Sequence, residues 1–166
     1  MNIKTVILSL SFLIYFSAAN AQGNRNPKEE IEKYGYIGQL IIADGENGIS
    51  NKTLEVLDSA YALDSNSLLL KQLLLVSNSK LITDSLRTDR IPQSISIVQS
   101  LLLNCSEKEK HDYYLALASF YKHSGDFKKA ISCYNNILIS ELYTPNRNYL
   151  FRGIATAKRG IQDAIE

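Results

Sequence analysis

Apolar residues recur along most of the chain at the three- and four-residue spacing of an amphipathic helix. The β-branched enrichment of sheet proteins is missing, since only three Val residues follow position 21. The pattern therefore predicts an all-α protein. Its eight expected helices cover residues 27–43, 52–64, 67–82, 92–104, 107–124, 127–141, 146–159 and 161–166.

Helix start signals support these ranges. Asn26-Pro27-Lys28-Glu29 places a capping residue before a Pro at the first helical position. Ser106-Glu107-Lys108-Glu109 has the spacing of a capping box, in which side chain and backbone groups satisfy each other. Thr144-Pro145 predicts another start. Gly125-Asp126 is typical of a turn, with Asp126 capping the next helix.

The first 21 residues have the three-part pattern of a secretory signal peptide. Lys4 precedes an apolar run at positions 6–16, and Ala19-Asn20-Ala21 supplies small residues for cleavage between Ala21 and Gln22. The run is shorter than the roughly 20 residues that span a bilayer, which argues against the alternative of an uncleaved anchor. We expect a secreted or periplasmic domain at 22–166, behind a leader that suits a bacterium.

A repeated spacing appears in the third pair of expected helices. Two small residues, Ala118 and Ala130, stand where two antiparallel helices would touch, and aromatic residues stand where neighbouring pairs would meet. The repeat-defining positions are Tyr114, Leu117, Ala118, Tyr121, Gly125, Ala130, Tyr134 and Ile137. Residues 112–138 resemble a tetratricopeptide repeat, most specifically at 122–131. The alternative is an irregular bundle of antiparallel helices with apolar residues at ordinary helical spacing.

A degenerate second copy follows 35 residues later. Tyr149, Gly153 and Gly160 take the places of Tyr114, Ala118 and Gly125. The copy departs from the pattern at Arg152, which stands in the place of Leu117, and it has room for only part of a second helix. About three and a half units are expected in total: a degenerate unit at 27–66, a helical hairpin at 67–105, the best match at 107–141 and a truncated unit at 145–166.

The resemblance implies a right-handed α-solenoid whose first helices form a wall that binds a protein or peptide, without catalysis or a cofactor. Gln39 and Asp112 stand where carboxylate-gripping members of the family carry other residues, which puts that particular role in doubt. The predicted partner-binding groove consists of Gln39, Gln72, Lys80, Asp112, Leu115, Ser119, Lys122, His123, Arg147 and Lys158.

The charge balance narrows the possible partners. Lys and Arg number 18 against 17 Asp and Glu, so the surplus of cations that nucleic-acid binding usually needs is missing. The chain has two His and two Cys, and we expect no metal or catalytic site made from them. His111 and His123 are expected on the surface. Cys105 and Cys133 are compatible with a disulfide, but the repeat register favours two buried thiols because it sets them roughly 10 Å apart along parallel helices.

Two function classes remain open at this level. The first is an exported, non-catalytic tetratricopeptide-repeat scaffold for protein interactions. The second is a small extracytoplasmic helical enzyme or small-ligand receptor whose site uses carboxylates or Tyr. The truncated last unit also predicts an exposed apolar end, with Phe151, Ile161 and Ile165, at which the protein would dock or self-associate.

Overall fold

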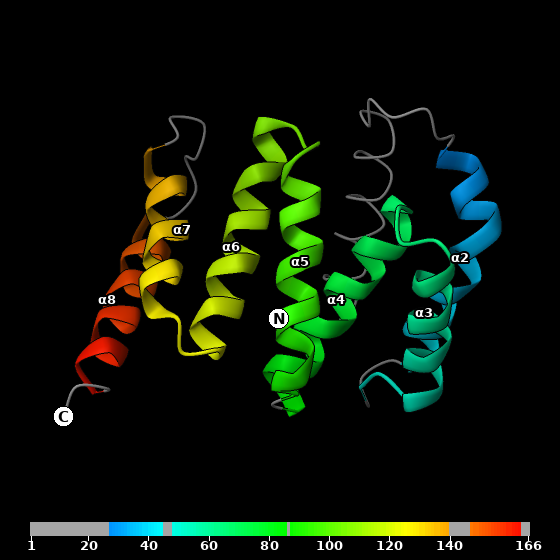
Figure 1. Cartoon of the computed structure of the whole chain (residues 1–166), viewed down its shortest axis with the longest axis horizontal. Helices are drawn as coiled ribbons and strands as arrows, with labels where there is room; N and C mark the ends of the chain where they lie inside the picture. The colour runs from blue at the N-terminus through cyan, green and yellow to red at the C-terminus, as the bar shows by residue number, and fades with distance from the viewer. Residues whose placement is uncertain (1–26, 45–47, 86, 140–146, 164–166) are drawn as a thin grey trace. The chain divides into compact units, whose positions relative to one another are not determined.

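The computed structural model describes residues 27–44, 48–85, 87–139 and 147–163, and helices dominate this part of the chain (Figure 1). Seven α-helices and one 3-10 turn account for 88% of the described residues, and no strand occurs among them. The all-α prediction is confirmed. The expected signal peptide at 1–21 and its cleavage site lie outside the described residues.

The chain divides into two compact units, with the division between Leu86 and Arg87. Unit 1 contains α2 (Pro27–Asp44), α3 (Asn51–Leu63) and α4 (Leu68–Ser85), and each of these helices contacts the other two. Aliphatic side chains from all three helices are fully buried and form its core. Among them are Ile37, Leu57, Leu70, Leu74 and Ile82.

Hydrogen bonds at the start of α4 fix its position against α2. The Ser67 hydroxyl oxygen accepts from the backbone N–H of Leu70 at 3.2 Å. The two carboxylate oxygens of Glu30, on α2, accept from the N–H groups of Leu68 and Leu69 at 3.2 and 3.0 Å. These N–H groups have no partner within their own helix, and a negative charge beside them is also favoured by the helix dipole. Glu30 therefore ties two helices together across 38 residues of sequence.

Unit 2 contains the short turn Thr88–Arg90 followed by α5 (Ile91–Leu102), α6 (Glu107–His123), α7 (Phe127–Ile139) and α8 (Arg147–Asp163). Each α-helix contacts the next one in the chain. Figure 1 shows the chain direction alternating from one helix to the next. Helix α6 contacts α5 and α7, and α7 contacts α6 and α8, so each of these two helices packs between two others.

The start signals at Ser106 and at Gly125-Asp126 are confirmed, whereas Thr144-Pro145 lies outside the described residues. Ser106 Oγ accepts from the N–H of Glu109 while the Glu109 carboxylate accepts from the N–H of Ser106, which is a complete capping box. Gly125 has a φ of +79°, a conformation that favours glycine, and it ends the turn after α6. Asp126 Oδ1 then accepts from the N–H of Lys129 at 3.2 Å and caps α7.

The last two expected helices, 146–159 and 161–166, are replaced by one. Helix α8, described over Arg147–Asp163, continues through Gly160, so the predicted turn at Gly160 is wrong. Residues 164–166 of the last expected helix lie outside the described residues. Gly160 has a different role: a Cβ atom there would lie 2.5 Å from the ring of Phe127. Gly153, seven residues earlier on the same face, stands in the same relation to the ring of Tyr134. The two glycines let α8 approach α7 closely.

Candidate functional site

The predicted groove in unit 1 is only partly exposed. Gln39 on α2 is exposed and Lys80 on α4 is half-buried. Gln72 is 8% exposed and therefore does not belong to a solvent-facing wall. The reason is that α4 buries residues around most of its circumference, from Leu69 to Ile82, so a position assigned from the repeat register alone fell on a covered side.

The predicted groove residues of unit 2 reach the surface to different degrees. Asp112 on α6 and Lys158 on α8 are exposed, and Lys122 is half-buried. His123 Nδ1 lies 2.8 Å from the Ser119 carbonyl oxygen, so its ring is held along α6. The other half-buried members of the set are Leu115, Ser119 and His123. The side chain of Arg147 lies outside the described residues.

The repeat-defining residues concentrate in the α6–α7 hairpin. Ala118 and Ala130 are both fully buried, as small residues at a close helix contact should be. Tyr134 is buried and its ring covers Gly153 of α8. Leu117 and Ile137 are also buried, whereas Tyr114 and Tyr121 are half-buried. The side chain of Tyr149 lies outside the described residues.

The two histidines differ in burial. His111 is 7% exposed, so its expected surface position is wrong. It lies seven residues before the fully buried Ala118 and therefore on the same, covered face of α6. His123 is half-buried. Over the described ranges, no three His, Cys, Asp or Glu side chains gather closely enough to hold a metal ion.

Both cysteines of unit 2 are free thiols. Cys133 is buried, and this burial raises the pKa of its thiol to about 11. Cys105 is half-buried, and burial, followed by the nearby Glu109 carboxylate, raises its thiol pKa as well. The Cys105 thiol donates to the Leu102 carbonyl oxygen at 3.6 Å. Since the thiolate is the reactive form, neither group is activated as a nucleophile.

Thiol labelling is expected to distinguish two free cysteines from a bridged pair. At pH 8 and without reductant, Cys133 in the native protein should react at least about 100-fold more slowly than the same thiol in denaturant, because its thiolate is scarce and buried. The denatured chain should show two reactive thiols. Single Cys105→Ser and Cys133→Ser variants assign the two rates, and a denatured chain without reactive thiols would establish the disulfide instead.

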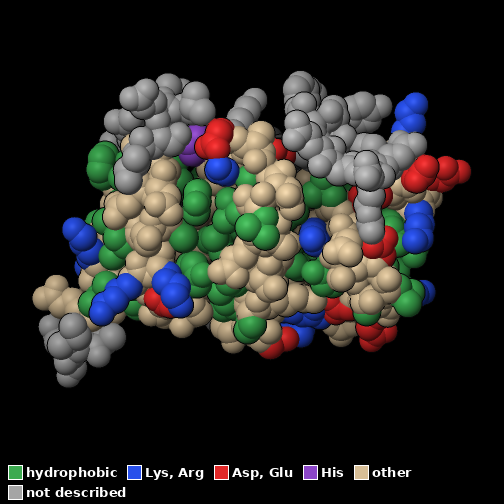
Figure 2. Space-filling view, turned by 45° about the horizontal axis from the view of Figure 1, so that its top comes forward, with side chains coloured by type: hydrophobic (Ala, Val, Ile, Leu, Met, Phe, Trp, Pro, Cys, Tyr) green, Lys and Arg blue, Asp and Glu red, His purple; other side chains and the backbone are tan. Residues whose placement is uncertain are grey.

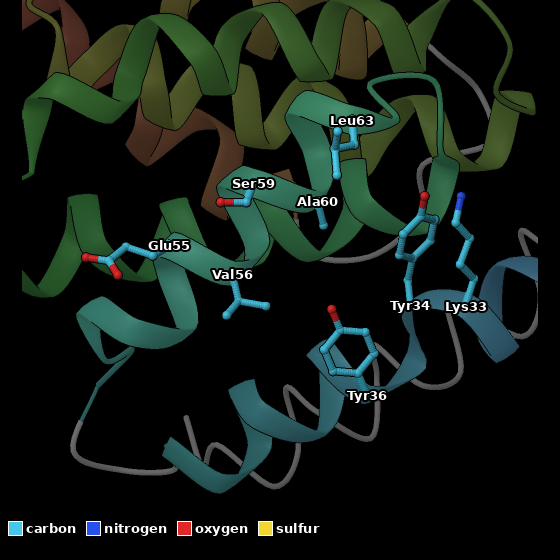
Figure 3. A pocket seen from close by; sticks show the side chains of 8 residues that line it. All are labelled: Lys33, Tyr34, Tyr36, Glu55, Val56, Ser59, Ala60 and Leu63. Carbon is cyan, nitrogen blue, oxygen red and sulfur yellow. The ribbon is translucent and has the colours of Figure 1, made fainter.

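A groove between α2 and α3 in unit 1 was not predicted from the sequence. Its volume is about 500 Å³, within the range of pockets that bind ligands or partner side chains. Figure 3 shows Tyr36 pointing from α2 into the space between the helices, with Lys33 and Glu55 at opposite ends. The lining residues are Lys33, Tyr34, Tyr36, Glu55, Val56, Ser59, Ala60 and Leu63.

The residues that line the groove include a buried, hydrogen-bonded tyrosine and two exposed apolar side chains. The buried Tyr34 donates its hydroxyl hydrogen to Asp64 Oδ2 at 3.1 Å, which joins the middle of α2 to the residue that follows α3. Lys33 Nζ lies 4.8 Å from the centre of the Tyr34 ring, at cation–π distance. Tyr36 is 53% and Leu63 is 90% exposed. Tyr34 and Ala60, which also line the groove, are buried, so its exposed apolar surface comes mainly from the two exposed side chains.

Comparison with protein-family models, curated proteins and solved structures finds no match for this chain. Figure 2 shows acidic and basic side chains in small groups of both signs on the face that it displays, in keeping with a formal net charge of +1. Among the described helices, none combines the length and the apolar character needed to cross a membrane.

The expected apolar end of the last unit is exposed in part. Phe151 on α8 is 55% exposed, as expected, whereas Ile161 is half-buried. Ile165 lies outside the described residues. The cationic residues Arg152, Lys158 and Arg159 of α8 are exposed as well. Self-association through this end stays a prediction.

Proposed function

We propose that the protein is an exported, non-catalytic scaffold of the tetratricopeptide-repeat type, which binds a protein or peptide segment. The observation that carries this proposal is the packing of α6, α7 and α8. Ala118 and Ala130 are fully buried in the hairpin, and the ring of Tyr134 covers Gly153 of the next helix. Small residues within a pair and a large residue between pairs are the arrangement that lets helix pairs stack.

In this proposal the helix pairs form a right-handed α-solenoid, and the exposed faces of α6 and α8 form the binding wall. Asp112, Lys122 and Lys158 supply charges of both signs at the surface of unit 2. A binding wall that carries both acidic and basic side chains favours a polar protein segment as the partner. The proposal includes export, with cleavage between Ala21 and Gln22 and a secreted or periplasmic location.

The groove between α2 and α3 supports a second candidate function, a small-ligand receptor or enzyme. Its volume and its tyrosines suit a small molecule. Catalysis by paired carboxylates needs two acidic groups about 5–9.5 Å apart. Glu55 is the one carboxylate among the eight lining residues. The groove therefore favours binding over acid–base catalysis.

A pull-down from the extracytoplasmic fraction of the source tests the proposed scaffold. The mature chain, residues 22–166, is compared with a Lys122→Glu, Lys158→Glu variant, which reverses two charges on the proposed wall. We expect the variant to lose a partner that the native chain retains, because the reversed charges repel groups that the lysines attracted.

A variant with Lys52→Glu and Lys128→Glu is the matched control. It has the same change in net charge, at two exposed positions outside the proposed wall. It should retain the partner. Loss of the partner by both variants would show an effect of net charge, and retention by both would remove the wall from the binding surface. The absence of any protein partner, together with binding of a small molecule by the native chain, would favour the receptor.

A further inference from the structure

Helix α3 exposes one large apolar side chain and two charged ones on the same side. Leu63 is 90% exposed, the highest value for any large apolar residue that the structure describes, and Lys52 and Glu55 are exposed as well. Successive steps of three and eight residues keep these side chains within about one third of the helix circumference. The small and exposed Ser59 lies halfway between Glu55 and Leu63 (Figure 3). We call Lys52, Glu55 and Leu63 the α3 face.

Helix α8 repeats this arrangement with charges of the opposite sign. Phe151 is 55% exposed, and Arg159 and Asp163 are exposed as well. Successive steps of eight and four residues again keep the three side chains within about one third of the helix circumference. The small and exposed Ala155 lies halfway between Phe151 and Arg159. We call Phe151, Arg159 and Asp163 the α8 face.

The two faces complement each other when the helices run antiparallel. On each helix the apolar residue and the nearer charge are separated by about 12 Å along the axis, at about 1.5 Å per residue, and the second charge lies about one turn further on. The facing pairs are then Leu63 with Phe151, Glu55 with Arg159, and Lys52 with Asp163. The small Ser59 and Ala155 meet halfway, which lets the two helices approach closely.

The charges around both faces favour such a contact between two copies of the chain. Within the part of the chain that the structure describes, the four charged residues of the two faces form no ion pair. Residues 22–86, which include α3, carry six Lys and Arg against nine Asp and Glu, whereas residues 87–166, which include α8, carry eleven against eight. The region around α3 is therefore net acidic and the region around α8 net basic, so the two attract each other across copies.

We propose that the α8 face of one copy of this chain binds the α3 face of a second copy, with the two helices antiparallel. The contact is heterologous, because each copy contributes a different surface, and a bound pair keeps one free face of each kind for further copies. A contact between two helix faces of about three turns is at the small end of protein interfaces, so we expect association at tens of micromolar protein and above. This inference goes beyond the proposed function and does not depend on it.

Sedimentation velocity of the mature chain, residues 22–166, tests the association. At about 50 mM salt, the weight-average sedimentation coefficient should rise as the protein concentration increases from about 5 to about 200 μM. At about 500 mM salt it should stay close to the monomer value over the same range, because the ions screen the facing charges. A monomer at every concentration in low salt would overturn the proposal, as would an association that high salt leaves unchanged.

A charge swap tests the location of the contact. Glu55→Arg and Arg159→Glu should each weaken association by about tenfold or more, because two like charges then face each other. The double variant, which has the net charge of the native chain, should associate again, since the two charges are only exchanged.

Glu32→Arg and Lys128→Glu are the matched controls, because they make the same changes in charge at exposed positions outside both faces. They should leave association within about twofold of the native value. A double variant as weak as the single ones, or equal losses in the controls, would overturn the proposed contact. Circular dichroism checks that each variant is folded.

Discussion

Gly153→Ala is expected to destabilise the protein by about 1–3 kcal/mol, although Ala is the better helix former. The new methyl group would lie 2.5 Å from the ring of Tyr134, which is itself buried and has little room to move. Helix α8 must then move away from α7 and lose part of their contact. The free energy of unfolding, measured by urea titration with circular dichroism at 222 nm, gives the size of the loss.

Two further glycine substitutions serve as controls. Gly35→Ala in α2 should stabilise the protein by about 0.5–1 kcal/mol, since its nearest neighbour would be Ile31 at 3.5 Å, an ordinary contact. Gly160→Ala should fall between the two, because the Phe127 ring that it meets is half-buried and can shift more easily. A stabilised Gly153→Ala protein would contradict the close packing of α7 and α8.

Local signals were sufficient to predict most of the helix boundaries. The capping box at Ser106, the left-handed Gly125 and the cap at Asp126 each depend on residues within one turn of chain. Because both partners of such an interaction are close together in the sequence, the sequence alone predicts where the interaction forms. The role of Glu30 could not be predicted in this way. Its carboxylate accepts hydrogen bonds from Leu68 and Leu69, which are 38 and 39 residues away in the sequence.

The error at Gly160 has the same origin. A glycine after a helical pattern predicts a turn when only neighbouring residues are considered. The alternative role, close approach to a ring on another helix, depends on where Phe127 lies in three dimensions. Burial of Gln72 and His111 was likewise decided by which helices surround α4 and α6. The repeat register predicts which face of each helix points to the solvent, but it does not show how many neighbouring helices cover that face.

The α2–α3 groove could not be predicted from the sequence for a related reason. Val56, Ala60 and Leu63 have the spacing of ordinary core residues, and nothing in that spacing shows that Leu63 is 90% exposed. A groove forms where two helices lie side by side and no other side chain fills the space between them, and a spacing within one helix does not show this. Tyr36 of α2 is likewise 53% exposed, although its position beside Ile37 does not distinguish it from a core residue.

Phe120→Ala is expected to destabilise the protein by about 3–5 kcal/mol, the largest effect of any substitution considered. Phe120 is 2% exposed and lies on α6, which contacts α5 and α7 at once. Its removal leaves a cavity in the interior of unit 2 that backbone movement fills only in part, so the loss exceeds the transfer free energy of the ring. A loss of this size is a large fraction of the stability of a small domain.

Phe151→Ala provides the matched comparison, since it deletes the same ring from α8 at a position that is 55% exposed. Its cost should stay below about 1 kcal/mol, because most of the ring already contacts water and no closed cavity forms. Urea unfolding of the two variants under identical conditions gives the difference. Similar losses for the two variants would mean that α8 is covered in solution, for example by a second copy at its outer face. A large difference supports the position of Phe120 in the interior of unit 2.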